Sequence, residues 1–323
     1  MRLVNMAIES TTTSASDQAG DAARTGRSDR GILAVALAFW QLSRPRIVAM
    51  VALTVIAGAL AAPQSIGLVS MFNVLVGATA AVVGALALNQ WIEQGSDGRM
   101  PRTAARPLPS GRLSDREVAC YSAGSTVFGL VYLAAMVNLP AALLAAASWL
   151  IYVWVYTPLK VFTAWQTPIG AIPGAMPVLI GSAAAGATFS AHGLALFAVV
   201  YFWQFPHAMA IAWLFREEFG RAGMRVASVT DPTGKTAATI ALVGATLSLP
   251  AGLFPLAGDG AGWGSALAAS ALGLLYLASS IGFARRRDDR MARVLLRVSV
   301  VYLPLVLAVL VASGLAGTWP CSG

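Results

Sequence analysis

The chain has 323 residues, of which 57% are hydrophobic and only 11% are charged, and its formal net charge at pH 7 is +8. Soluble globular domains carry roughly 25% charged residues, so this composition excludes that class and indicates an integral membrane protein. The basic residues lie in short segments between apolar runs, where they are expected to set membrane orientation, so no nucleic-acid partner is predicted.

The N-terminal segment is rich in Ser, Thr, Ala and Asp and lacks the apolar core of a signal peptide. We therefore expect residues 1–38 to form a disordered cytoplasmic tail, followed by a single transmembrane domain over 39–318 and a short tail at 319–323. The run between Arg46 and Glu93 carries no formal charge. It has room for two apolar helices, each needing about 20 residues to cross a bilayer.

Seven further apolar runs bring the predicted number of spans to nine; they lie near 118–136, 140–157, 168–188, 194–215, 236–256, 262–284 and 296–316. Only helices satisfy every backbone group of such runs inside lipid, so the sequence predicts an all-α membrane protein. Basic residues fall on alternate connections, which places the N-terminus and the basic loops in the cytoplasm and the C-terminus outside. Gly170 and Gly174 form a GxxxG pattern that favours close helix packing.

A polar cluster follows the second span. Asn89, Glu93 and Asp97 recur every four residues, so on a helix they share one face and offer three oxygen ligands. Magnesium suits such a face, because it binds one or two carboxylates together with the oxygens of a substrate phosphate. The alternative is an ordinary helix C-terminus that leads into a solvated loop.

The loop after this face is basic. Arginines at 99, 102, 106 and 112 alternate with prolines that end the helix and turn the chain back towards it. These arginines could hold the remaining oxygens of that phosphate. The alternative is the general excess of positive charge in cytoplasmic loops.

A second cluster of the same kind follows the sixth span, where Glu217 and Glu218 stand next to Arg216 and Arg221. Two such clusters on one side of the membrane could each hold a metal ion against one diphosphate. Alternatively, the two glutamates pair locally with Arg221 and Arg225.

Two isolated ionisable residues lie close to apolar segments. Lys160 is a candidate phosphate ligand or a lysine that snorkels at a helix end. His207 follows an aromatic stretch that includes Trp203, and it is either a neutral imidazole bonded between helices or a group that contacts a bound molecule.

Several runs, in this order, carry a resemblance to a known family: Asn89-x-x-x-Glu93-x-x-x-Asp97, Met100-Pro-Arg102-Thr103-x-x-Arg106-Pro107-Leu108, Tyr156-Thr-Pro-Leu-Lys160, Trp203-Gln-Phe-Pro-His207 and Arg216-Glu217-Glu218. The chain from about residue 40 onward resembles the UbiA-type intramembrane prenyltransferases and, within them, the branch that farnesylates haem. Glu93 and Glu218 depart from that pattern, because each is one methylene longer than the aspartate common there.

The resemblance implies a nine-helix bundle around a central cavity in a bacterial inner membrane. It implies transfer of a farnesyl group from farnesyl diphosphate to a vinyl group of haem B, with addition of water, to give haem O. It also implies the roles of the site residues. The catalytic residues are Asn89, Glu93, Asp97, Glu217 and Glu218, and Mg²⁺ is bound by Asn89, Glu93, Asp97 and Glu218. The diphosphate is bound by Arg102, Arg106, Lys160, Arg216 and Arg221, and the haem side is formed by Trp203 and His207.

Three alternatives stay open from the sequence. The acceptor could be an aromatic acid or a chlorophyllide, or the chain could be a transporter or a haem-handling assembly protein. The transporter is disfavoured because the acids cluster at helix ends and not at mid-membrane. A haem A synthase or a terminal oxidase assembly is a candidate partner, and the sequence does not decide between them.

Overall fold

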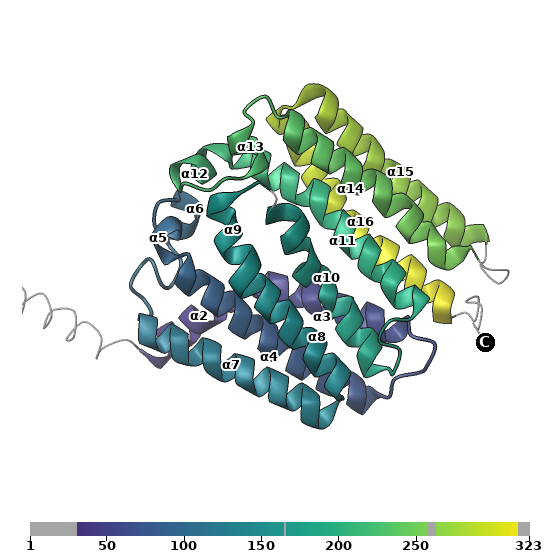
Figure 1. Cartoon of the computed structure of the whole chain (residues 1–323), viewed down its shortest axis with the longest axis horizontal. Helices are drawn as coiled ribbons and strands as arrows, with labels where there is room; N and C mark the ends of the chain where they lie inside the picture. The colour runs from purple at the N-terminus through teal and green to yellow at the C-terminus, as the bar shows by residue number, and fades with distance from the viewer. Residues whose placement is uncertain (1–30, 165, 258–262, 316–323) are drawn as a thin grey trace, which may run out of the picture.

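The computed structural model describes residues 31–164, 166–257 and 263–315, and every regular element in these ranges is helical (Figure 1). Eight elements are long and apolar enough to cross a membrane: α4 (Leu68–Ile92), α7 (Asp115–Met136), α8–η1–α9 (Leu139–Phe162), α10 (Gln166–Ala184), α11 (Ala191–Leu214), α14–η2 (Lys235–Leu256), α15 (Trp263–Arg286) and α16 (Asp289–Leu315). A bent pair, α2 (Ile32–Leu42) and α3 (Pro45–Leu60), meets the same length and composition criteria only when the two helices are taken together, and counted as one span it brings the number to nine within the described residues. The predicted all-α membrane bundle is confirmed.

The first span bends by 51° between α2 and α3. Arg44 stands at the bend with φ 49°, a left-handed backbone conformation, directly before Pro45. Proline disfavours the right-handed helical conformation in the residue before it, so the helix cannot run straight through. Gln90 on α4 donates a hydrogen bond to the carbonyl oxygen of Leu42 at 2.6 Å, which holds the end of α2 against α4.

Some predicted boundaries differ from the structure. Helix α2 begins at Ile32, inside the segment 1–38 predicted as a tail, because residues 32–42 form an apolar helical run. The rest of that tail and residues 319–323 lie outside the described residues. Helix α16 begins at Asp289 and not near 296, because the side chain of Asp288 accepts a hydrogen bond from the Met291 amide at 2.7 Å and caps the helix start.

The fourth span continues past residue 157, where the sequence predicts that it ends. It consists of α8 (Leu139–Leu150), a π-helical turn η1 (Ile151–Tyr156) and α9 (Thr157–Phe162). Pro158 directly follows the π-helical turn, where the helical hydrogen-bond pattern changes, and the helix continues through it. The span therefore carries Lys160 on its last turn.

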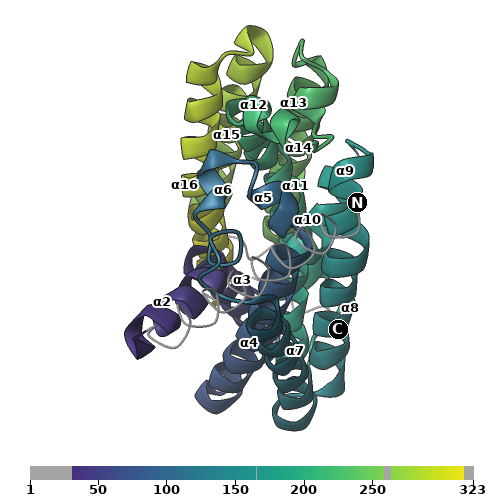
Figure 2. The same cartoon turned by 90° about the vertical axis from the view of Figure 1, so that its left-hand side faces the viewer.

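Small residues allow the spans to pack closely. A Cβ atom on Gly129 of α7 would meet the backbone of Ala81 on α4, and the Ser122 hydroxyl donates to the Gly84 carbonyl at 2.8 Å. Helices α3 and α10 pack in the same way at Gly58. The short helices α5 (Gln94–Asp97), α6 (Pro101–Ala104), α12 (Arg216–Arg221) and α13 (Ala227–Thr230) gather at one end of the bundle (Figures 1 and 2). The two polar connections, one joining α4 to α7 and the other joining α11 to α14, therefore lie at the same end.

Candidate functional site

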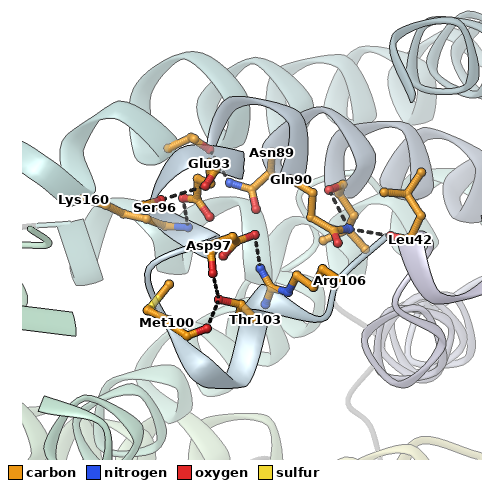
Figure 3. Close-up of polar contacts among 12 residues, drawn as sticks. Leu42, Asn89, Gln90, Glu93, Ser96, Asp97, Met100, Thr103, Arg106 and Lys160 are labelled. Atoms are coloured by element: carbon orange, nitrogen blue, oxygen red, sulfur yellow. Dashed lines mark hydrogen bonds and ion pairs between the residues drawn. The ribbon is translucent and has the colours of Figure 1, made fainter. Parts of the chain in front are cut away.

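The predicted polar face spans two helices and not one. Helix α4 ends at Ile92, Glu93 adopts φ −89° and ψ 2°, and α5 continues from Gln94. The helical hydrogen bonds nevertheless persist, because the Glu93 amide donates to the Asn89 carbonyl at 2.9 Å and the Asp97 amide to the Glu93 carbonyl at 2.8 Å. The three side chains therefore stay in line across the break (Figure 3).

Each acidic side chain of this face pairs with a base from elsewhere in the fold (Figure 3). Glu93 Oε1 lies 2.6 Å from Lys160 Nζ on α9, and Asp97 Oδ2 lies 2.5 Å from Arg106 Nη1 in the loop after α6. The Asp97 side chain is 1% exposed and that of Glu93 is 10% exposed. Charge-assisted bonds of this kind hold the carboxylates in fixed positions.

Asn89 completes the face but has an unsatisfied atom. Its residue is fully buried, and its Nδ2 donates to the Thr157 hydroxyl at 3.1 Å. Its Oδ1 is enclosed without a hydrogen-bond partner among the described residues. Buried polar atoms are nearly always bonded, so an oxygen in this state fits a ligand atom for a cation.

The basic loop folds over this face. The Thr103 hydroxyl donates to the Asp97 carbonyl at 2.8 Å, and Met100 is buried beneath the turn. Burial lowers the pKa of the Arg106 guanidinium, and the positive charge of Arg44 lowers it further, while Asp97 acts in the opposite direction. Arg44 and Arg106 are thus two positive charges that lie near each other, and such an arrangement favours a bound anion.

The two polar connections meet at Arg102. Its guanidinium carbon lies 4.3 Å from the centre of the Phe215 ring and 5.5 Å from that of Phe219. Such cation–π contacts hold α6 against the start of α12. Arg102 is therefore held in place by the second connection, although the acids of that connection do not contact it.

A cavity of about 410 Å³ lies between these elements. Its walls include two acidic side chains, Glu93 and Asp97, and four basic ones, Arg44, Arg102, Arg106 and Lys160, together with His207. The excess of positive charge suits a polyanion such as a diphosphate, with the carboxylates available for cations that accompany it. The structure thus brings the acids and arginines of the first predicted cluster to one cavity with Lys160 and His207, while Asn89 is not one of the residues that line it.

The second predicted cluster is placed differently. Glu217 and Arg221 are exposed, while Arg216 donates to Asp289 Oδ1 on α16 at 2.8 Å and to the Trp213 carbonyl at 2.7 Å. Glu218 is partly buried, and its Oε2 is enclosed without a partner among the described residues. None of these four side chains lines the cavity, to which their connection contributes Phe219, Met224 and Val226 instead.

No group of three or more His, Cys, Asp or Glu side chains close enough for a metal ion occurs in the described part of the chain. The predicted ligand set, Asn89, Glu93, Asp97 and Glu218, contains three carboxylates, and the structure does not gather them into one such group, because Glu93 and Asp97 line the cavity and Glu218 does not. The enclosed, unbonded oxygens of Asn89 and Glu218 fit the oxygen chemistry of Mg²⁺. Of the two adjacent glutamates, Glu218 is the one with an unsatisfied buried oxygen.

A second cavity of about 340 Å³ adjoins the first and is mainly apolar. The two share Arg44, Ile47, Tyr156 and Lys160 as wall residues. The Gly170–Gly174 pattern, predicted to serve helix packing, lies on its wall. A Cβ on Gly170 would meet the Tyr156 ring, and one on Gly174 would meet the amide of Gln204, so these glycines make room for side chains at the cavity.

Sequence reasoning missed several wall residues. Arg44 was interpreted only as a topology signal, and its position before a proline was the one available hint. Tyr152 carries no periodic signal that separates it from other buried side chains, whereas Tyr156 and Gln204 stand in the quoted runs but are assigned no role there.

Comparison with known proteins identifies the family. The model of the UbiA prenyltransferase family matches residues 50–302. This chain belongs to the UbiA prenyltransferase family. It is 40% identical over 282 residues to a protoheme IX farnesyltransferase of Rhodopirellula baltica, covering 84% of this chain and 97% of that protein. It is 34% identical over 277 residues to the mitochondrial protoheme IX farnesyltransferase of Arabidopsis thaliana, covering 84% of this chain and 63% of that protein.

Solved structures show that the fold is that of the UbiA family. A structure of digeranylgeranylglyceryl phosphate synthase superposes with a TM-score of 0.72 at 15% identity, over 87% of this chain and 99% of that one. A UbiA homologue from Archaeoglobus fulgidus, bound to GPP and Mg²⁺, superposes with a TM-score of 0.62 at 16% identity, over 84% and 99% of the two chains. The resemblance seen in the sequence motifs is confirmed.

Proposed function

We propose that this UbiA-family chain transfers the farnesyl group of farnesyl diphosphate to a vinyl group of haem B and adds water, giving haem O. The observation that carries the proposal is the meeting of two cavities at Tyr156 and Lys160. One cavity is lined by charged side chains and suits a diphosphate, and the other is lined mainly by apolar side chains and suits an isoprenoid chain. The relatives named protoheme IX farnesyltransferase support haem B as the acceptor.

The diphosphate end of the substrate is assigned to the charged cavity. Arg102, Arg106 and Lys160 supply donors for phosphate oxygens, and Arg44 adds a fourth positive charge. Lys160 and Arg106 bond to Glu93 and Asp97, so each base is already held at the cavity by a carboxylate. Arg216 and Arg221, which lie off the cavity wall, stay predictions from the sequence motif.

Magnesium is the cofactor of this proposal. One ion would be held by Asn89, Glu93 and Asp97 and a second by Glu218, and the unbonded buried oxygens of Asn89 and Glu218 support that assignment. When bound, Mg²⁺ neutralises the negative charge that develops on the departing diphosphate. The UbiA homologue solved with GPP and Mg²⁺ is consistent with this use.

The farnesyl chain is assigned to the apolar cavity. Trp149, Tyr152 and Tyr156 line it, and aromatic faces stabilise positive charge such as that of an allylic cation. The Tyr156 ring already lies 4.6 Å from the ammonium group of Lys160. Apolar walls also exclude water, which would otherwise capture the cation and hydrolyse the donor.

The reaction balances as follows. The bond between the first farnesyl carbon and the diphosphate oxygen breaks, and the haem vinyl group forms a bond to that carbon. Water then adds to the resulting cation next to the porphyrin ring and loses one proton. We assign His207 and its stacked neighbour Trp203 to the haem side, because His207 lines the charged cavity and does not line the apolar one that is assigned to the farnesyl chain.

The protein is an integral membrane protein, and its orientation is part of the proposal. We place it in a bacterial inner membrane, as the sequence resemblance implies. The basic connections alternate along the chain, which supports an orientation with the N-terminus and the charged cavity facing the cytoplasm and the C-terminus outside. Delivery of the product to a haem A synthase or an oxidase assembly stays a prediction.

The proposal is tested by incubating the purified protein in lipid with haem B, farnesyl diphosphate and Mg²⁺. The molecular mass of the extracted haem is then measured by mass spectrometry. We expect a mass gain of one farnesyl group plus one water, abolished by a chelator. Prenylation of 4-hydroxybenzoate without a change in haem would contradict the assigned acceptor while keeping the reaction class.

A further inference from the structure

Ser299 on α16 is fully buried, and its hydroxyl makes two short contacts. The hydroxyl oxygen lies 2.7 Å from the carbonyl oxygen of Leu296 and 2.8 Å from Nδ1 of His207 on α11. The serine therefore connects the last membrane helix to a side chain of the charged cavity.

The single hydroxyl proton of Ser299 decides which nitrogen of the His207 imidazole carries a proton. A carbonyl oxygen only accepts hydrogen bonds, so the single hydroxyl proton of Ser299 is directed to Leu296. The contact with His207 must then use a proton on the imidazole, which places that proton on Nδ1. Among the described residues no carboxylate pairs with the ring, so a buried imidazolium would be uncompensated and the ring is neutral.

A neutral imidazole with its proton on Nδ1 carries a lone pair on Nε2. This atom has no hydrogen-bond partner in the described ranges and is not among the fully enclosed polar atoms that lack one. His207 lines the charged cavity. Its Nε2 is thus the polar atom of the ring left for a molecule in that cavity.

The ring is also fixed in orientation. The indole of Trp203 stacks on it with ring centres 4.9 Å apart and planes 26° from parallel. The Trp203 Nε1 donates to the backbone carbonyl of Ser299 at 2.7 Å, and the Tyr276 hydroxyl donates to the Trp203 carbonyl at 2.7 Å. Helices α11, α15 and α16 together hold His207 in one rotamer.

We propose that Ser299 is a positioning residue that fixes His207 as the Nδ1–H tautomer and so presents the Nε2 lone pair to the cavity. Its use by the haem substrate rests on the proposed function. There the lone pair can accept the proton that water loses on adding to the vinyl-derived cation, or it can bind the haem iron. Both uses require an unprotonated Nε2.

The tautomer is measured first, without substrate. The chain contains two histidines, so ¹⁵N-histidine labelling of the His192→Gln variant in lipid leaves one imidazole for solid-state NMR. We expect a protonated Nδ1 and an unprotonated Nε2. The Ser299→Ala variant is expected to shift the ring towards the Nε2–H form, and Ser299→Thr to preserve the original form. Finding Nε2–H in the protein with Ser299 intact would overturn the proposal, whether or not the protein farnesylates haem.

Turnover is measured next. We expect Ser299→Ala to lower kcat about tenfold, which corresponds to the loss of one hydrogen bond to the His207 imidazole. The KM for farnesyl diphosphate should stay unchanged, and Ser299→Thr should restore kcat. Ser280→Ala is the matched control, because Ser280 is equally buried and bonds its own helix, at the Tyr276 carbonyl. Equal losses in the Ser280 and Ser299 variants would overturn the proposal, since they would mark a general packing effect.

Haem titration separates the two uses of the lone pair. If Nε2 binds the iron, Ser299→Ala changes the absorption spectrum of bound haem. If Nε2 accepts a proton, the spectrum stays the same while turnover falls. Either result supports the positioning role, and normal turnover with an unaltered spectrum in Ser299→Ala overturns it.

Discussion

At the scale of single residues, the charged cavity depends on two acid–base pairs that are largely withdrawn from water. Glu93 bonds to Lys160 and Asp97 to Arg106, and the Asp97 side chain is almost completely buried. Removal of one partner from a buried pair leaves the other charge uncompensated, which costs roughly 3–5 kcal/mol. The pairs are therefore sensitive positions for stability as well as for the proposed metal and diphosphate binding.

Neutralising either acid should stop the reaction. We expect Glu93→Gln and Asp97→Asn to lower turnover on the order of 100-fold or more, because each removes a carboxylate that would hold Mg²⁺ against the leaving diphosphate. Product formation from haem B is measured across a range of Mg²⁺ concentrations, with membrane insertion and thermal unfolding checked in parallel.

The control for this pair of variants is Asp115→Asn, which neutralises an exposed carboxylate at the start of α7, away from the cavity. It should leave turnover unchanged. Retained activity at high Mg²⁺ in both Glu93→Gln and Asp97→Asn would refute the metal role.

At the scale of elements, breaks in regular helices position the functional groups. The π-helical turn Ile151–Tyr156 widens the fourth span just before Lys160, and the Tyr152 and Tyr156 rings on it lie 5.5 Å apart. π-turns often mark functional sites, because the extra residue shifts the side chains that follow. The interruption at Glu93 between α4 and α5 lies on the facing helix.

The start of α14 shows how a polar connection is held together. Gly234, with φ 75°, precedes the helix and offers no side-chain cap. Asp231 accepts hydrogen bonds from the Thr233 hydroxyl at 2.6 Å and from the Thr236 amide at 2.8 Å. These bonds lower the pKa of the Asp231 carboxyl, first through the Thr233 hydroxyl and then through Thr236.

We expect Asp231→Ala to lower the Tm of the protein in detergent at pH 7. A carboxyl whose pKa is lower in the folded state stabilises the fold above its unfolded pKa of about 4, and this stabilisation is lost as the pH falls through the folded value. The Tm difference from the unsubstituted protein should therefore narrow below about pH 4. Lys235→Ala, which removes a neighbouring exposed charge, serves as control. A Tm difference that is independent of pH would contradict the stabilising role of the Asp231 carboxylate.

At the scale of the whole molecule, the bundle encloses a charged chamber and an apolar one that meet at Tyr156 and Lys160. The apolar chamber runs along the fourth span as far as Ala145, roughly 20 Å from Lys160 at 1.5 Å per residue. Small side chains at Ala78 and Ala145 leave its far end open. The length of prenyl chain that fits is thus set by helix packing.

Filling the far end should shorten the accepted chain. We expect Ala145→Leu to lower turnover with farnesyl diphosphate by about fivefold relative to turnover with geranyl diphosphate, because the added methyl groups occupy space that a longer chain needs. Ala142→Leu, on the same helix but off the chamber wall, should lower thermal stability without changing this ratio. An unchanged ratio in Ala145→Leu would place the prenyl chain elsewhere.

The sequence by itself determined the class of fold, the nine spans, the four-residue spacing of the first polar face and the family. These features are local, because span length follows from bilayer thickness and a helical face follows from residue spacing. The partner of each charge was decided only by the tertiary structure. Glu93 meets Lys160 across 67 positions of sequence, whereas Arg216, expected at the diphosphate, meets Asp289. Such pairings depend on how the helices rotate and pack against one another, which local periodicity does not specify.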